Sequence, residues 1–346
     1  MIQENLAYSY YTTLAKFNRQ GIFSCTKILK NIAQGLECCN DIDIKENDIL
    51  IYHKSILDIL LKDRTTKRNI LWATAGYDSY GKCYSANCEI KISLITGKYK
   101  DIIQPRICKN LKNKRARTKD KAEVFTPSWV CNAQNNLIDE QWFGRKDIFN
   151  FQIEQSWITN YQKIEFKKQK GNTWKDYVIS KRIEITCGEA PYLVSRYDTV
   201  TGKKIDVVDR VGLLDRKLRV INENTETLDA WMKWTVKAYK SVYGYEYQGD
   251  NLLLARENLL YTFIDNMKYK FNIFPTLNQL KKIANIISWN IWQMDGLTGT
   301  VPVKAMQEQL ILGLFEDDKR QECLVKDWNT NTVIKYNSLL QRDKNE

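Results

Sequence analysis

The chain has 346 residues, of which 43% are hydrophobic and 12% aromatic, and this composition excludes an intrinsically disordered protein. Its 53 lysines and arginines against 41 acidic residues give a formal charge of +12, which favours a polyanion such as nucleic acid as partner and disfavours a basic one. No apolar run approaches the ~20 residues of a membrane span and the first residues lack an export signal, so we expect a cytoplasmic protein.

Cysteine usage indicates reduced thiols. The chain has nine cysteines, an odd number scattered along its length, and a single histidine, His53. Cys83 and Cys88 are the one spaced pair that could begin a metal site, besides the adjacent Cys38 and Cys39. Because no second pair completes four ligands, we expect core or surface thiols and no metal.

Residues 1–105 predict a small α+β domain. Apolar side chains recur at helical spacing over 8–39, in two pieces, and again over 48–61. Residues 69–74 and 88–96 alternate or run apolar as strands do. Nothing in this domain has catalytic spacing.

Residues 106–122 predict an exposed basic linker. From 109 to 121 the chain has seven basic residues against one acidic, and such blocks of like charge stay solvated. One interpretation is a plain solvated connection. The other is contact with DNA phosphates, which adds affinity without sequence choice. The candidate DNA-binding residues are Lys109, Lys112, Lys114, Arg115, Arg117, Lys119 and Lys121.

From residue 123 onward, short apolar strands alternate with helices, which predicts an α/β domain with parallel strands. The insert 197–240 is unusually long for a connection between the first two strands. The expected strands are 183–186, 242–246 and 286–292, and the expected helices are 251–264 and 276–285.

Acidic residues stand at or near the ends of these strands. Glu184 belongs to the run Ile183-Glu-Ile-Thr-Cys-Gly-Glu-Ala190, in which Gly188 lets the backbone approach a ligand closely. Glu246 ends the next strand, where a carboxylate can accept the hydrogens of two ribose hydroxyls. A structural turn for the first and a helix cap for the second are the alternatives.

Two further segments complete a pattern. Phe125-Thr-Pro127 precedes a predicted helix, and Asn290-Ile-Trp-Gln-Met-Asp-Gly-Leu297 ends the third strand. In the order Phe125-Thr-Pro, Cys187-Gly, Glu246, Asp295, these segments resemble the cofactor-binding half of the amino-group DNA methyltransferases, which methylate N6 of adenine with S-adenosylmethionine. Ile185 and Ala190 depart from that family pattern, which has Pro and Gly there.

The resemblance implies a Rossmann-like, S-adenosylmethionine-dependent methyltransferase sheet over residues 123–346, preceded by the smaller α+β domain. It also implies double-stranded DNA as substrate and a place in a restriction-modification system. The implied cofactor-binding residues are Phe125, Thr126, Pro127, Glu184, Cys187, Gly188, Glu246, Trp292 and Asp295. Thr126 would bind the methionine carboxylate and Asp295 the adenine amine, with Trp292 beside the ring. The alternative for Asp295-Gly296 is a plain turn after the strand.

The family's catalytic Asn-Pro-Pro-Tyr segment is missing. The chain has five prolines, and no two are adjacent. The resemblance therefore implies a sheet incomplete at its C-terminus, no catalytic residue in this chain and no activity of the chain alone. We expect a second polypeptide to supply the catalytic motif and target recognition.

Two other function classes stay open. One is a non-catalytic module that keeps the methyltransferase shell and binds DNA or a partner. The other is a restriction nuclease, for which metal-binding carboxylates must cluster near a lysine. The places to look are Glu154, Glu165 with Lys167 and Lys168, and Asp209 and Asp215 near Lys217.

Overall fold

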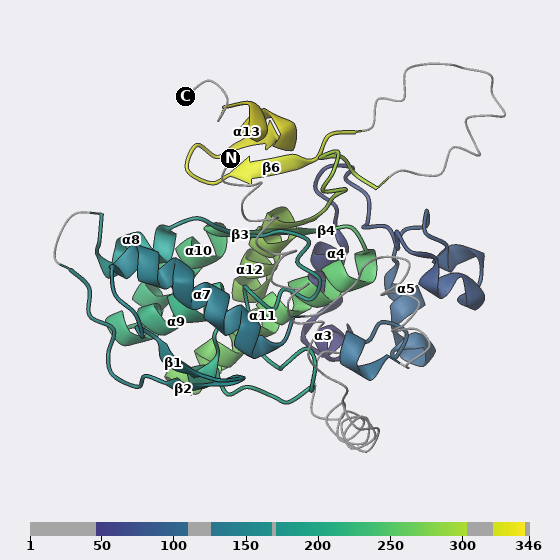
Figure 1. The fold of residues 1–346 in the computed structure, drawn as a ribbon. Helices are drawn as coiled ribbons and strands as arrows, with labels where there is room; N and C mark the ends of the chain where they lie inside the picture. Colours follow the sequence, from purple (N-terminus) through teal and green to yellow (C-terminus); the bar gives the residue numbers. More distant parts are fainter. Residues whose placement is uncertain (1–45, 110–125, 168–170, 303–320, 343–346) are drawn as a thin grey trace, which may run out of the picture.

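The computed structural model describes residues 46–109, 126–167, 171–302 and 321–342, which form a mixed α/β structure (Figure 1). The α-helices in these ranges are α3 (Glu46–Tyr52), α4 (Lys54–Leu61), α5 (Ile92–Ile95), α7 (Ser128–Phe143), α8 (Trp174–Ile179), α9 (Leu213–Asn224), α10 (Leu228–Lys240), α11 (Gly249–Phe271), α12 (Leu277–Asn290) and α13 (Tyr336–Arg342). The 3-10 helices are η1 (Ala75–Tyr80), η2 (Lys82–Tyr84), η3 (Gly97–Tyr99), η4 (Arg106–Cys108) and η5 (Val207–Asp209).

A three-stranded parallel sheet organises the structure. It consists of β3 (Arg182–Glu184), β4 (Val242–Glu246) and β5 (Ile291–Gln293), in the order β3-β4-β5. The middle strand contacts α10, α11 and α12, and all five of its residues are buried. Because the strands are parallel, their carboxyl ends meet at one edge of the sheet. The parallel sheet predicted from the alternation of strands and helices is thus present over three strands.

Two antiparallel hairpins lie outside this sheet. The first joins β1 (Asn150–Ile153) to β2 (Ser156–Thr159), and the second joins β6 (Leu324–Asp327) to β7 (Thr332–Lys335). Figure 1 shows them at opposite ends of the molecule, with α13 beside the second. The second hairpin and α13 cover one face of the sheet, where Val325 and Tyr336 pack against Tyr245 and Trp292.

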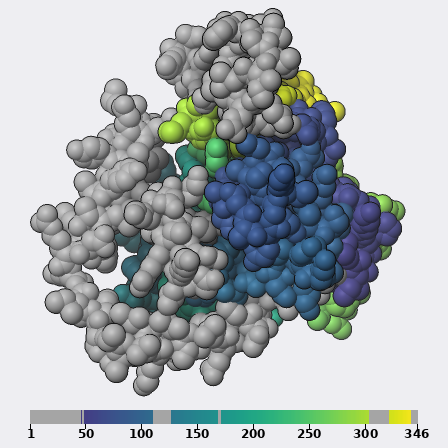
Figure 2. All heavy atoms as spheres, turned by 90° about the vertical axis from the view of Figure 1, so that its right-hand side faces the viewer, coloured from purple at the N-terminus to yellow at the C-terminus, as the bar shows by residue number. Residues whose placement is uncertain are grey.

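The segment between α3 and η4 packs directly on the sheet domain. Figure 2 shows the blue segment that follows α4 beside the purple helices on one face. Arg256 of α11 is fully buried and donates to the carbonyl groups of Leu60 and Lys62, at the end of α4, and of Ile291. One hydrophobic core runs through both parts, from Ile49 to Ile291. The domain boundary at residue 105 stays a prediction, and the core is continuous across it.

Several predicted elements match the structure. The strand at 242–246 and the helix over 251–264 are confirmed, the latter inside the longer α11. The helix over 48–61 is present as α3 and α4, which meet at His53, the residue that caps α4. The insert 197–240 contains α9 and α10, so the connection is long because it holds two helices. The helices predicted over 8–39 lie outside the described residues.

Other predicted elements are wrong in part. Residues 286–290 are the last turn of α12 and not a strand, because Ile286 and Ile287 continue the buried face begun by Ile283. Residues 69–74 and 88–96 pair only through the isolated bridge between Leu71 and Glu89, and 92–95 are helical. None of the helices in the described ranges has the length and apolarity needed to span a membrane.

Candidate cofactor site at the carboxyl edge of the sheet

Glu246 and the turn after β3 meet at the carboxyl edge of the sheet. Glu246 Oε2 accepts a hydrogen bond from the Gly188 N–H at 2.9 Å, and its Oε1 accepts one from the Gln248 N–H at 3.0 Å. The Cys187 N–H donates to the Tyr245 carbonyl at 2.9 Å and extends the β3–β4 pairing into the turn. Glu246, Cys187 and Gly188, which the sequence predicts to act together, are therefore neighbours.

The backbone of this turn is strained. Thr186 and Ala190 have positive φ angles of 48° and 63°, on either side of Gly188 at 53°. The left-handed region is costly for any residue with a side chain, and especially for a β-branched one such as threonine. Backbone strain of this kind gathers at ligand sites, where the surrounding structure holds it in place.

Glu184 shapes the same loop from inside. Its carboxyl is buried and accepts hydrogen bonds from the N–H groups of Tyr192, at 3.2 Å, and Leu193, at 3.0 Å. Burial raises the pKa of Glu184 to about 8, and the nearby charge of Glu246 acts in the same direction against the two backbone donors. Glu184 thus positions the loop, and in this structure its oxygens point at backbone amides.

The first turn of α7 lies near the same edge. Pro127 precedes Ser128 at the helix start as predicted, and the Ser128 N–H donates to Asp198 at 2.8 Å. Cys131, one turn further, lies close enough to Glu184 for its charge to raise the pKa of the thiol, although burial is the larger cause. Thr126 precedes this turn, and its carbonyl oxygen accepts a hydrogen bond from the Thr199 hydroxyl at 2.8 Å. Phe125 lies outside the described residues.

Trp292 and Asp295 are placed differently from Glu246. In the register of the sheet Trp292 pairs with Tyr245, so its side chain lies on the opposite face from Glu246, in the cluster under the β6–β7 hairpin. The Asp295 carboxylate accepts the Leu297 N–H at 2.9 Å within its own turn. The structure thus argues against Trp292 as a wall of the Glu246 site, because strand residues alternate between faces.

Sequence reasoning missed two acids at this edge. Glu189 accepts the Arg106 N–H at 2.7 Å and the Tyr197 hydroxyl at 2.5 Å. Asp250, at the start of α11, accepts the Tyr77 hydroxyl at 2.7 Å. The sequence holds a signal for each acid. Glu189 directly follows the Cys187-Gly188 turn, and Asp250 lies four residues after Glu246, the last residue of β4.

Lys109 belongs to the same edge. Its ammonium is buried and pairs with Asp250 at 2.9 Å. An ammonium held inside by a buried carboxylate is not available to a DNA phosphate, so the structure argues against Lys109 as a DNA contact. The other candidates of the basic linker, Lys112, Lys114, Arg115, Arg117, Lys119 and Lys121, lie outside the described residues.

Four acidic side chains lie at this edge among the described residues. Glu184 and Glu246 end β3 and β4, whereas Glu189 and Asp250 lie in the segments that follow these strands, and Asp250 is paired with the buried Lys109. Carboxylate oxygens can accept hydrogen bonds from the hydroxyl groups of a ligand. In the described part of the chain, no group of three or more histidine, cysteine or acidic side chains could hold a metal ion.

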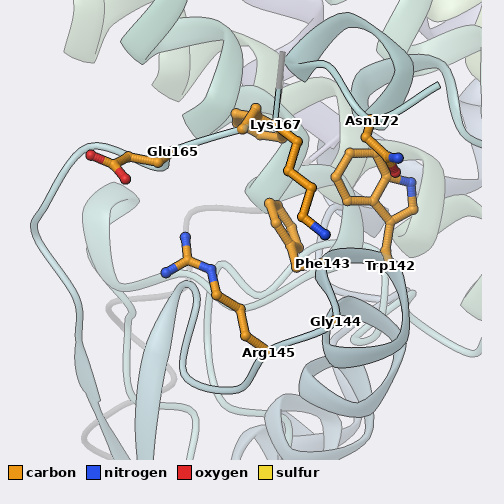
Figure 3. A pocket seen from close by; sticks show the side chains of 8 residues that line it. Trp142, Phe143, Gly144, Arg145, Glu165, Lys167 and Asn172 are labelled. Carbon is orange, nitrogen blue, oxygen red and sulfur yellow. The ribbon is translucent and has the colours of Figure 1, made fainter. Parts of the chain in front are cut away.

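A pocket of about 330 Å³ lies elsewhere, at the C-terminal end of α7. Figure 3 shows Trp142, Phe143, Arg145 and Lys167 around its opening, with Glu165 pointing away from it. None of the predicted cofactor residues lines this pocket.

The positions of Glu165, Asp209 and Lys217 do not support the nuclease hypothesis. Among the described residues that line this pocket, Glu165 is the one carboxylate. Asp209 accepts hydrogen bonds from the hydroxyls of Thr159 and Tyr161. The buried Lys217 donates to the Ser241 hydroxyl instead, so Asp209 and Lys217 bind different partners. Lys168 lies outside the described residues.

Comparisons with family models, with curated proteins and with solved structures find no match to this chain.

Proposed function

We propose that the chain is the S-adenosylmethionine-binding part of an adenine-N6 DNA methyltransferase of a restriction-modification system. The observation that carries this proposal is the contact between the Glu246 carboxylate and the Gly188 amide. A carboxylate at the end of one parallel strand beside a glycine turn at the end of the next is the arrangement that nucleotide-binding sheets use for a ribose.

The strand order supports the proposal. Glu184 and Glu246 end the adjacent parallel strands β3 and β4, and Asp295 follows β5, so the three residues lie along one edge of the sheet, where a nucleotide would bind. The start of α7 lies near this edge, because the charge of Glu184 acts on the Cys131 thiol.

The catalytic motif would come from residues outside this sequence, on a second polypeptide as the resemblance implies. β3 supports this with an open edge, because it pairs with β4 only among the described strands. Ile183 is 48% exposed and Ile185, just beyond the strand, is 56% exposed. Unpaired strand edges and exposed aliphatic side chains favour the addition of another strand.

Isothermal titration of the full chain with S-adenosylmethionine tests the proposal. We expect saturable binding to the wild-type protein, at least tenfold weaker in Glu246→Ala, and unchanged in Glu226→Gln, which alters an exposed acid in the loop before α10. Since Glu246 also holds the turn, thermal unfolding of each variant shows whether the loss is local. Absence of binding to the wild-type chain would refute the proposal.

One observation favours the alternative of a non-catalytic module. Glu246 is only 6% exposed, and both of its oxygens accept backbone amides. If these two hydrogen bonds only stabilise the turn, the chain has the arrangement of a nucleotide site but binds no nucleotide. The same titration separates the two functions, because the module binds no S-adenosylmethionine.

A further inference from the structure

A row of tryptophans and cations lies away from the candidate cofactor site. Cationic side chains stand over the rings of four tryptophans, at 4.2 to 5.8 Å from a ring centroid. We call this set the Trp–Lys stripe. Its members are Trp174, Trp234, Trp289, Trp328, Arg64, Lys67, Lys175, Lys237, Lys240 and Lys326.

The stripe consists of two groups of contacts, which α10 joins through Lys237 and Lys240. Lys175 stands over both Trp174 and Trp234, whose rings are 4.7 Å apart, and Lys237 stands over Trp234 at 4.2 Å. Lys240, one helical turn further along α10, stands over Trp328 at 4.7 Å.

From there the contacts pass to the end of α12. Lys326 lies over both Trp328 and Trp289, and Trp289 is also covered by Arg64 and Lys67. The stripe therefore runs from α8 across α10 and β6 to the turn after α4.

The centre of the stripe lies at the amino edge of the sheet. Lys240 lies two residues before the first residue of β4 and Trp289 two residues before the first residue of β5, whereas Glu246 ends β4. Trp328 is fixed there by a 2.8 Å hydrogen bond from its indole N–H to Asn290. Since the strands are parallel, the stripe and the candidate cofactor site lie at opposite edges of one sheet.

The cations of the stripe lack acidic partners among the described residues. No ion pair joins Arg64, Lys67 or the lysines of the stripe to a carboxylate within the described ranges. The nearby charges of Lys282 and Lys326 lower the pKa of Lys240, after burial as the larger cause. Two acids lie near the ends of this set. The charge of Asp63 opposes the larger effect of burial, which lowers the pKa of Arg64, and Asp327 follows Lys326 and accepts a hydrogen bond from the Asn329 N–H. The fold thus gathers like charges at this edge.

We propose that the Trp–Lys stripe binds the phosphate backbone of double-stranded DNA, at a surface separate from the candidate cofactor site. The indole faces hold the ammonium groups in a row by cation–π contact, so the cations are ordered before a polyanion arrives. Phosphate contact releases counterions and gives affinity without sequence choice. This inference does not depend on the proposed methyltransferase function.

Two other polyanions fit the stripe less well. Single strands bind where aromatic rings are open for base stacking, and here cations already cover the rings. An anionic membrane favours protruding apolar side chains, and the four tryptophans are only half exposed. Binding to the phosphates of a DNA duplex requires only ordered positive charge, which the stripe has.

Fluorescence anisotropy with a labelled 30-base-pair duplex tests the proposal on the full chain. We expect Lys237→Gln, Lys240→Gln and Lys326→Gln together to weaken binding at least tenfold at low salt. The slope of log Kd against log salt concentration should fall by about 2 to 3, at ~0.9 for each phosphate that the variant no longer neutralises. The matched control changes three exposed lysines outside the stripe, Lys163, Lys203 and Lys204, to glutamine, and should bind as the wild type does.

Each other outcome overturns the proposal. Equal losses in the stripe and control variants would mean that total charge alone binds DNA. Tighter binding of a single strand of the same length, or of phosphatidylserine vesicles, would assign the stripe to another partner. Binding of S-adenosylmethionine to the stripe variant should be unchanged, so a failed cofactor titration and a failed DNA titration remain distinguishable.

Discussion

Single residues at the carboxyl edge combine burial with charge, and Glu184 is the clearest case. Its carboxyl is fully enclosed, its two backbone donors favour ionisation, and desolvation outweighs them, so its pKa rises to about 8. A carboxyl whose pKa is higher in the folded state than in the unfolded chain binds a proton on folding. Its contribution to stability is complete below about pH 4.5 and is lost as the pH rises through 8.

We therefore predict that Glu184→Gln flattens the pH dependence of stability. On a scale of ~1.4 kcal/mol per pH unit, the ionised carboxyl costs the folded state several kcal/mol above pH 8. The free energy of unfolding, measured by urea titration at about pH 5 and about pH 9, should fall less in this variant than in the wild type. Glu226→Gln should keep the wild-type difference. Identical differences in all three proteins would contradict the burial of a neutral Glu184.

At the scale of elements, the Gln293 side chain makes with Leu71 the backbone hydrogen bonds that a neighbouring strand would make. Gln293, at the end of β5, accepts the Leu71 N–H and donates to the Leu71 carbonyl, both at 2.8 Å, and donates to the Tyr247 carbonyl at 2.9 Å. Gly249 lets the Leu71 backbone approach so closely that a Cβ there would lie 1.9 Å from the Leu71 oxygen. The segment after α4 is thus held against the carboxyl edge of the sheet.

Gln293→Ala should destabilise the protein by about 2–4 kcal/mol, because it leaves buried backbone groups without partners. Chemical denaturation measures the change, and Gln162→Ala, at an exposed position, should stay within about 0.5 kcal/mol of the wild type. A loss below about 1 kcal/mol in Gln293→Ala would show that water or neighbouring groups replace these hydrogen bonds.

The sequence predicts elements better than it predicts their partners. The strand at 242–246 follows from its aromatic and β-branched residues, but the pattern at 286–290 predicts a strand where the structure has a helix, because a short buried helix and a buried strand are equally apolar. The pairing of Lys109 with Asp250 joins residues 141 positions apart, and no local pattern reveals it. The face of Trp292 depends on its register with Tyr245, which strand propensity does not determine.

At the scale of the whole molecule, the sheet separates two charged edges. Acidic side chains gather at the carboxyl ends of the strands, and the Trp–Lys stripe lies at their amino ends. Under the proposed function, this division would keep the cofactor and the DNA phosphates on different surfaces of the sheet. The segment from α3 to η4 belongs to the same hydrophobic core as the helices and strands of the sheet, so it supports the sheet.

We predict that α4 and α12 open as one unit in native-state hydrogen exchange, because their apolar faces share one core and Arg256 links the elements around them. Amides of both helices should report the same opening free energy. If the amides of α4 open several kcal/mol more easily than those of α12, the segment before residue 105 is an independent domain, as the sequence alone suggests.

Hydrogen exchange with and without S-adenosylhomocysteine tests whether a nucleoside cofactor binds where the Gly188 turn meets Glu246. We expect slower exchange in residues 187–193 and at the start of α11, with no change in the Trp–Lys stripe. Unchanged exchange at the carboxyl edge in saturating ligand, or protection confined to another part of the molecule, would contradict binding at this site.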